Sequence, residues 1–280
     1  MMAGTVPVLS ILFMGLALVI SAALPVGLCI YFHRAKKAAL FPFFIGCAAM
    51  ILSAFVLESL AHRCILSTNA GAVILENIWL YGLYGGAMAG LFEETGRFIA
   101  FKTILRNHRD NDANALMYGA GHGGIEAFVI LGITSINNII YSVLINTGRT
   151  EVLTGPLAGD MRKQVEAAIH ALITTPSWYF LIGGVERILA VILQISLSVL
   201  VWFAAKKKNR IYYYPLAIVL HLIVDAGAVI LSGRNVSPLV VEVVVAAFTV
   251  LSVLIAGRVW QENTDGEPQG RFSGSFSGRP

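Results

Sequence analysis

The sequence predicts an all-α, polytopic membrane protein, a bundle of about seven transmembrane helices. Of its 280 residues, 57% are hydrophobic and only 13% are charged, whereas soluble domains carry about 25% charged residues. The apolar residues also gather in long runs. A run of about twenty such residues is the length that spans a bilayer as a helix.

Seven runs are long enough: 6–32, 38–61, 72–105, 113–143, 177–205, 213–231 and 238–259. The first has no Lys or Arg before it and no clear cleavage site, so we expect a retained helix and not a signal peptide. The third and fourth are longer than a bilayer requires and should tilt or project. We expect residues 1–260 to form a single transmembrane domain, and residues 261–280, rich in Gly, Ser and Arg, to be a disordered cytoplasmic tail.

Basic residues follow alternate helices, and this pattern predicts the orientation. They are Arg34, Lys36 and Lys37, then Lys102, Arg106 and Arg109, then Lys206, Lys207, Lys208 and Arg210, and finally Arg258. Because Lys and Arg concentrate on the cytoplasmic side, the N-terminus should lie outside and the C-terminus in the cytoplasm, with the protein integral to the plasma membrane. The outer loop 147–174 should contain a short interfacial helix near 162–169. Nothing in the composition suggests nucleic-acid binding.

The most costly stretch is Leu91-Phe92-Glu93-Glu94-Thr95-Gly96-Arg97, which places three charges inside the third apolar run. A charge at membrane depth costs about 2.5–3.5 kcal/mol on insertion scales, and such residues usually face a protein interior or a water-filled cavity and mark function. Glu93 and Arg97 are four residues apart, so we expect them to pair on one face of the helix. The simpler alternative is that this pair only ties helices together.

Two other helices carry ionisable residues at a matching depth. The fourth contains His122 and Glu126, and the sixth contains His221 and Asp225. At a rise of 1.5 Å per residue, Arg97 and the two histidines lie roughly 12–14 Å from the predicted cytoplasmic helix ends, and the carboxylates roughly 18–20 Å. Three helices that agree in depth predict one convergent polar site.

Four glycines surround His122, namely Gly119, Gly121, Gly123 and Gly124. They allow either a bound ligand or an ordinary close approach of helices. Glu186 and Arg187 lie near the middle of the fifth helix, and since adjacent helical residues do not face each other, each should pair with another helix. Glu58 and Glu242 are interpreted as helix-end or interhelical polar groups.

This set of residues suits hydrolysis, which needs a base to activate water and donors for the developing oxyanion. Glu93 can serve as the base, while His122 and His221 can donate to the oxyanion or orient the water. Two histidines and a carboxylate can instead hold Zn²⁺ with an open fourth position, with Glu93 as the base beside it. Asp225 or Glu126 would then be the third ligand, or would orient its neighbouring histidine. The common His-Glu-x-x-His zinc motif is absent.

The order of these motifs resembles a known group of enzymes. Glu93-Glu94-x-x-Arg97, Tyr118-x-x-x-His122 and His221-x-x-x-Asp225 are similar to the motifs of the CAAX protease and bacteriocin-processing superfamily of intramembrane endopeptidases. Within it, the chain most resembles the YhfC branch of intramembrane metalloproteases, over about residues 80–230. The superfamily pattern has three residues between the second Glu and Arg, and Phe in place of Tyr118, so this chain departs from it at both points.

The resemblance implies a peptidase that cuts a membrane-associated or prenylated peptide or protein. It implies Glu93 or Glu94 as the water-activating base, and His122, His221 and Asp225 as oxyanion or metal groups. It does not distinguish a zinc-dependent mechanism from a glutamate-dependent one that needs no metal.

Two other functions fit the same residues. A transporter could use Glu93, His122, Glu126, His221 and Asp225 as a path for protons or divalent cations. A non-catalytic protein, of the bacteriocin-immunity or scaffold kind, could retain the fold alone. The sequence favours the enzyme, because a water-activating base with two histidines exceeds what binding requires.

Overall fold

The computed structural model describes residues 4–264, and these confirm the prediction of an all-α polytopic bundle. The elements are α1 (Val8–Lys36), α2 (Phe41–Met50), the π-helical η1 (Ile51–Glu58), α3 (Ser59–Leu66), α4 (Asn69–Glu76), α5 (Ile78–Lys102), the 3₁₀ turn η2 (Arg106–His108), α6 (Ala113–Ala127), the π-helical η3 (Phe128–Gly132), α7 (Ile133–Asn146), α8 (Glu151–Thr154), α9 (Gly159–Thr174), α10 (Trp178–Lys206), the 3₁₀ turn η4 (Lys208–Arg210), α11 (Tyr213–Gly233) and α12 (Pro238–Thr264). The expected tail lies outside the described residues, except that 261–264 continue α12.

Among residues 4–264, six continuous helical stretches are long and apolar enough to cross a membrane: Val8–Lys36, Phe41–Leu66, Ala113–Asn146, Trp178–Lys206, Lys208–Gly233 and Pro238–Thr264. They correspond to six of the seven predicted spans. The remaining one corresponds to α5, which has 25 residues, long enough for a bilayer. Its charged cluster, which includes Glu93, Glu94 and Arg97, separates it in composition from the other six.

The predicted run 72–105 is not one helix, because Asn77 interrupts it. Asn77 has an extended backbone, and its side chain accepts hydrogen bonds from the amides of Trp79 at 2.9 Å and Leu80 at 3.3 Å. This is the geometry of a helix N-cap. Helix α5 therefore starts at Ile78, and the residues before Asn77 form the separate short helix α4, capped by Thr68.

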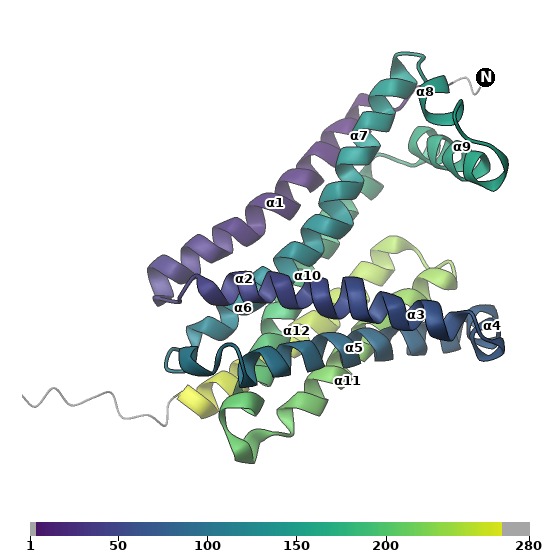
Figure 1. Ribbon diagram of the computed structural model, residues 1–280. Coiled ribbons are helices and arrows are strands. Elements are labelled where there is room, and N and C mark those ends of the chain that lie inside the picture. The colour runs from purple at the N-terminus through teal and green to yellow at the C-terminus, as the bar shows by residue number, and fades with distance from the viewer. Residues whose placement is uncertain (1–3, 265–280) are drawn as a thin grey trace, which may run out of the picture.

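The helices are arranged in two groups that diverge from one end of the molecule (Figure 1). Helix α5 packs on α11, α1 packs on α6 and α7, and α10 contacts members of both groups. We call the end that carries Lys36, Lys102 and Lys206 the basic face, and the end that carries α4, α8 and α9 the opposite face. The charge bias predicts that the basic face is cytoplasmic.

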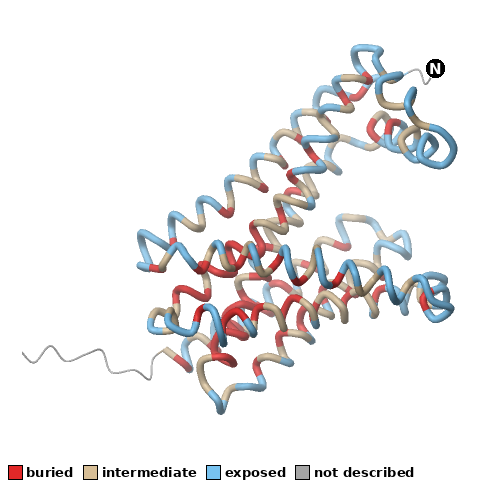
Figure 2. Tube along the Cα trace, viewed as in Figure 1, coloured by how far each residue is buried: buried red, intermediate tan, exposed pale blue. Residues whose placement is uncertain are grey.

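The outer surface of the bundle is apolar. Large hydrophobic side chains such as Leu12, Phe44 and Val243 are exposed, which suits contact with lipid. Helix α10 is central instead, with 72% of its most apolar window buried, against 28% or less in the other candidate spans. Buried positions gather where α6 and α10 meet their neighbours (Figure 2). The predicted interfacial helix is present as α9, which buries Ile169 and Leu172 and leaves its charged side exposed.

The glycines of α6 serve close helix packing on three sides. A Cβ at Gly119 would lie 2.6 Å from Cα of Ile195 in α10. A Cβ at Gly121 would collide with the backbone carbonyl of Phe43 in α2, and one at Gly124 with Pro25 of α1. Removing these side chains lets three helices reach the backbone of α6, and this close approach brings the residues that α6 carries into the centre of the bundle.

We expect Gly121→Ala to destabilise the protein, since its Cβ would meet backbone atoms that cannot rotate away. Overpacking of this kind typically costs about 1–3 kcal/mol. Gly85→Ala is the matched control, because nothing lies within 4 Å of a Cβ there and alanine favours a helix over glycine by roughly 0.5–1 kcal/mol. Thermal unfolding in detergent measures both variants. Equal melting temperatures for the two would contradict the packing described.

Candidate active site

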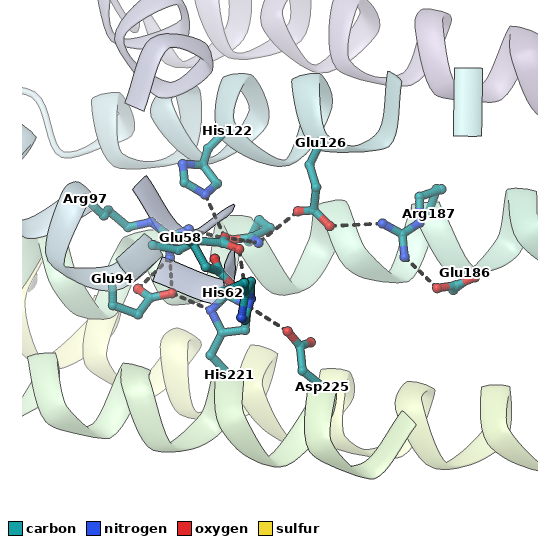
Figure 3. A network of polar contacts seen from close by, with 12 residues as sticks. Glu58, His62, Glu94, Arg97, His122, Glu126, Glu186, Arg187, His221 and Asp225 are labelled. Atoms are coloured by element: carbon teal, nitrogen blue, oxygen red, sulfur yellow. Dashed lines mark hydrogen bonds and ion pairs between the residues drawn. The ribbon is translucent and has the colours of Figure 1, made fainter. Parts of the chain in front are cut away.

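Glu93 of α5 contacts side chains from α6, α10 and α11. Figure 3 shows the polar cluster to which it belongs, with Glu94, His122 and His221 among the labelled members. Oε2 of Glu93 lies 3.0 Å from Nε2 of His122 in α6 and accepts a hydrogen bond of 2.9 Å from Nε2 of Gln194 in α10. Its Oε1 lies 4.0 Å from Nε2 of His221 in α11. The carboxylate is therefore held through one oxygen, while the other faces the second histidine without a hydrogen bond.

Arg97 pairs with Glu94, so the predicted pairing with Glu93 is wrong. Its Nη1 donates to both carboxylate oxygens of Glu94, at 2.9 and 2.7 Å. Both side chains are completely buried. The reason is the direction of the side chains: Glu93 points toward α6 and α10, whereas Glu94, three residues before Arg97, lies on the same helical face as the guanidinium. Nη2 of Arg97 also donates to Oε1 of Gln194.

Glu94 orients His221 through Nδ1 of the ring, whereas the sequence had left open whether Asp225 orients this histidine or binds a metal. Nδ1 of His221 lies 2.9 Å from Oε1 of Glu94. Its Nε2 lies 3.4 Å from Oδ2 of Asp225, one turn further along α11. Because the bond to Glu94 fixes the ring, Nε2 is directed at the space between Glu93 and Asp225.

Glu126 forms no hydrogen bond with His122 in the described part of the chain, so the alternative in which it orients this histidine is wrong. Its Oε2 accepts a hydrogen bond of 2.9 Å from Nε2 of Gln194, and its Oε1 accepts one of 3.0 Å from Nη1 of Arg187. Arg187 thus pairs with another helix, as predicted. Its Nη2 also donates to the adjacent Glu186 at 2.5 Å, contrary to prediction, because the long arginine side chain folds back past its own backbone.

Gln194 is the residue that sequence reasoning missed. Its amide nitrogen donates to both Glu93 and Glu126, and its amide oxygen accepts from Arg97. It therefore links the two halves of the cluster. A signal was present in the sequence: Gln194 is a polar residue inside the run Val191–Leu200, and it lies seven residues, about two helical turns, after Arg187.

An aromatic plug formed by Phe101, Tyr118 and Trp202 closes the cluster on the side of the basic face. All three side chains are fully buried. Tyr118 stacks on His122 with ring centroids 5.8 Å apart, and Phe101 makes edge contacts with Tyr118 and Trp202 at 4.5 and 5.0 Å. The plug fixes the ring of His122, whose Nδ1 is buried without a hydrogen-bond partner.

The cluster fits a zinc site in its residue types and in the direction of its donors. Zinc ligands with bonds of 2.0–2.1 Å in a tetrahedron lie about 3.3 Å apart, and Nε2 of His221 lies 3.4 Å from Oδ2 of Asp225. The bond from Glu94 to Nδ1 of His221 is the outer contact typical of metal-binding histidines. Within residues 4–264, however, no three His, Cys, Asp or Glu side chains already surround a common centre. Binding would require these side chains to turn toward a common centre.

A second, smaller polar group lies on η1, α3 and α5. Glu58 is buried, with 8% of its surface exposed. It lies 3.1 Å from Nε2 of His62, whose Nδ1 lies 2.9 Å from the hydroxyl of Tyr84. Glu58 therefore resembles Glu93 in burial and in its histidine partner, but it has no hydrogen bond to the Glu93 cluster.

Comparison with known proteins gives the same family that the motifs suggested. The family described as YhfC intramembrane metalloprotease matches residues 20–246, more than the stretch 80–230 that carries the motifs. The uncharacterised membrane protein YhfC of Bacillus subtilis (strain 168) is 36% identical over 258 residues, which are 90% of this chain and 98% of that protein. No solved structure matches the chain. The chain is an integral membrane protein and belongs to the YhfC intramembrane metalloprotease family.

Proposed function

We propose that the protein is an intramembrane endopeptidase that hydrolyses a peptide bond of a membrane-associated peptide or protein. The observation that carries the proposal is the position of Glu93, a buried carboxylate with a histidine from α6, a histidine from α11 and an amide from α10 around it. The plasma membrane as its location, and its place in the CAAX protease and bacteriocin-processing superfamily, are part of this proposal.

Glu93 is the general base. A base must present a free lone pair to water while its carboxylate stays fixed. Oε2 is fixed by His122 and Gln194, and Oε1 is the free oxygen. Glu94 is a poor alternative, because Arg97 and His221 occupy its carboxylate. Of the two glutamates that the motif leaves open, Glu93 is therefore the one able to take a proton.

The residues that would hold zinc are His122 and His221, each through Nε2, together with Asp225. A bound zinc ion supplies a water of lowered pKa and polarises the carbonyl that is attacked. Around it, Glu94 keeps the ring of His221 in place through Nδ1. Gln194 donates a hydrogen bond of its own to Glu93. The base would therefore stay in position if Nε2 of His122 bound zinc instead of Glu93.

Gln194 is a positioning residue in this proposal. Replacing it with Leu would remove two donated hydrogen bonds and one accepted bond from buried charged groups. Each buried polar group left without a partner costs about 1–3 kcal/mol. The amide thus contributes to stability as well as to the orientation of the base.

Glu93→Gln should abolish peptide cleavage, since the amide cannot accept the proton of water. General-base catalysis typically contributes 10²–10⁴-fold, so we expect a loss of at least about 100-fold. The assay is a screen of the purified protein in liposomes against membrane-anchored peptides. Glu58→Gln is the matched control, a buried glutamate whose hydrogen-bond partner is His62 and not a residue that contacts Glu93, and it should retain cleavage. Proton or metal flux without cleavage in the unaltered protein would contradict the proposal and favour the transporter.

Gln194→Leu should lower both the melting temperature and the rate of cleavage, whereas Gln164→Leu, at an exposed position of α9, should change neither. Surface substitutions of that kind usually stay within about 0.5 kcal/mol. Thermal unfolding in detergent gives the stability, and cleavage of the best peptide from the screen gives the rate. Unchanged values for Gln194→Leu would show that the amide does not hold Glu93.

A further inference from the structure

The Glu93 cluster is enclosed toward the basic face and open toward the opposite face. Arg97 and His122 are fully buried beside the aromatic plug. Exposure then rises along the cluster, from 7% for the side chain of Glu93 to 38% for Asp225 and 44% for Glu186.

Two cavities continue the opening. An inner cavity of about 80 Å³ is bounded by Glu93, Arg187, Asp225 and Thr249, among others. An outer cavity of about 600 Å³ is bounded by Ser232, Asn235, Ser237 and Glu242, among others. Glu186 belongs to both. We call the two together the vestibule.

The same three helices line both cavities, which argues that the vestibule is one continuous path. On α10 the lining runs from Gly183 through Glu186 to Ala190. On α11 it runs from Ser232 to Ala228, and on α12 from Glu242 to Thr249. At the junction, Arg187 bridges Glu126 and Glu186 (Figure 3).

Two polar atoms along this path indicate that it is wet. Oγ1 of Thr249 and Oε2 of Glu242 are buried and have no hydrogen-bond partner within the described part of the chain. Thr249 as a whole is 1% exposed. Buried polar groups almost always find a partner, and ordered water is the usual one when protein supplies none. Both atoms belong to residues that line the vestibule.

The alternative entrance is an apolar groove of about 510 Å³ between α2, η1 and α5. Its lining includes Ala49, Leu52 and Ile99, and none of Glu93, His122, His221 and Asp225 contributes to it. Such a lining suits lipid and repels water, so this groove cannot supply the water that hydrolysis consumes.

We propose that water reaches Glu93 from the opposite face, through the vestibule and past the Arg187 ion pairs at the junction of its two cavities. This inference rests on the proposed hydrolysis for its meaning. Its test does not, because water access can be measured in an inactive protein.

The test is cysteine accessibility in a background from which Cys29, Cys47 and Cys64, all free thiols, have been removed. A charged, membrane-impermeant thiol reagent is applied to each face of sealed vesicles in turn. Exposed reference cysteines at Lys163, on α9 at the opposite face, and at Lys208, at the basic face, report which side is labelled.

Two matched pairs of Ala→Cys variants carry the comparison. Ala190 and Ala228 line the vestibule, whereas Ala204 and Ala217 lie on the same two helices near the basic face and are fully buried. Because only a water-exposed thiolate reacts readily, Ala190→Cys and Ala228→Cys should react at least about tenfold faster than their partners. They should react from the side that labels the Lys163 reference, and equally in a Glu93→Gln background.

Several results would overturn the inference. One is labelling of Ala204→Cys or Ala217→Cys in preference to the vestibule positions. A second is labelling of the vestibule positions from the side that labels the Lys208 reference. A third is no labelling of Ala190→Cys or Ala228→Cys from either side. Labelling of Ala49→Cys would place the entrance at the apolar groove instead. Vestibule labelling in a protein that cleaves no peptide would uphold the access path and contradict only the proposed function.

Discussion

The fold depends on the cost of placing charge inside an apolar bundle. Arg97 is fully buried, and its contacts to Glu94 and Gln194 neutralise and solvate it. Breaking a buried pair by removing one partner typically costs about 3–5 kcal/mol. A helix with this cluster is stable only where neighbouring helices bring polar groups to the same depth. The positions of α6, α10 and α11 around α5 follow from that requirement.

Close packing makes the convergence possible. The glycines of α6 let α1, α2 and α10 approach its backbone, and this brings His122 within hydrogen-bonding distance of Glu93. The same approach leaves no room for water on the basic side of the cluster. The vestibule opens on the other side, where α10, α11 and α12 line it. Close helix packing thus encloses one end of the site, and the vestibule leaves the other end open.

The sequence was sufficient for the membrane-spanning architecture and for the principal residues of the cluster, because hydropathy and charge report directly on membrane depth. It was not sufficient for the pairing. Helical spacing allowed Arg97 to meet either Glu93 or Glu94, and only the rotation of α5 against α6 and α10 selects Glu94. Gln194 was overlooked because an uncharged polar residue barely disturbs an apolar run. The interruption at Asn77 depended on a local cap within a run that otherwise reads as continuous.

In the proposed chemistry, His122, His221 and Asp225 would hold zinc beside Glu93 as the base. The most direct measurement is the zinc content of the purified protein after loading and removal of excess metal. The account predicts stoichiometric zinc in the unaltered protein and in Glu93→Gln and Glu58→Gln, and its loss in folded His122→Ala and His221→Ala. Zinc absent from the unaltered protein, or retained in both histidine variants, would contradict it.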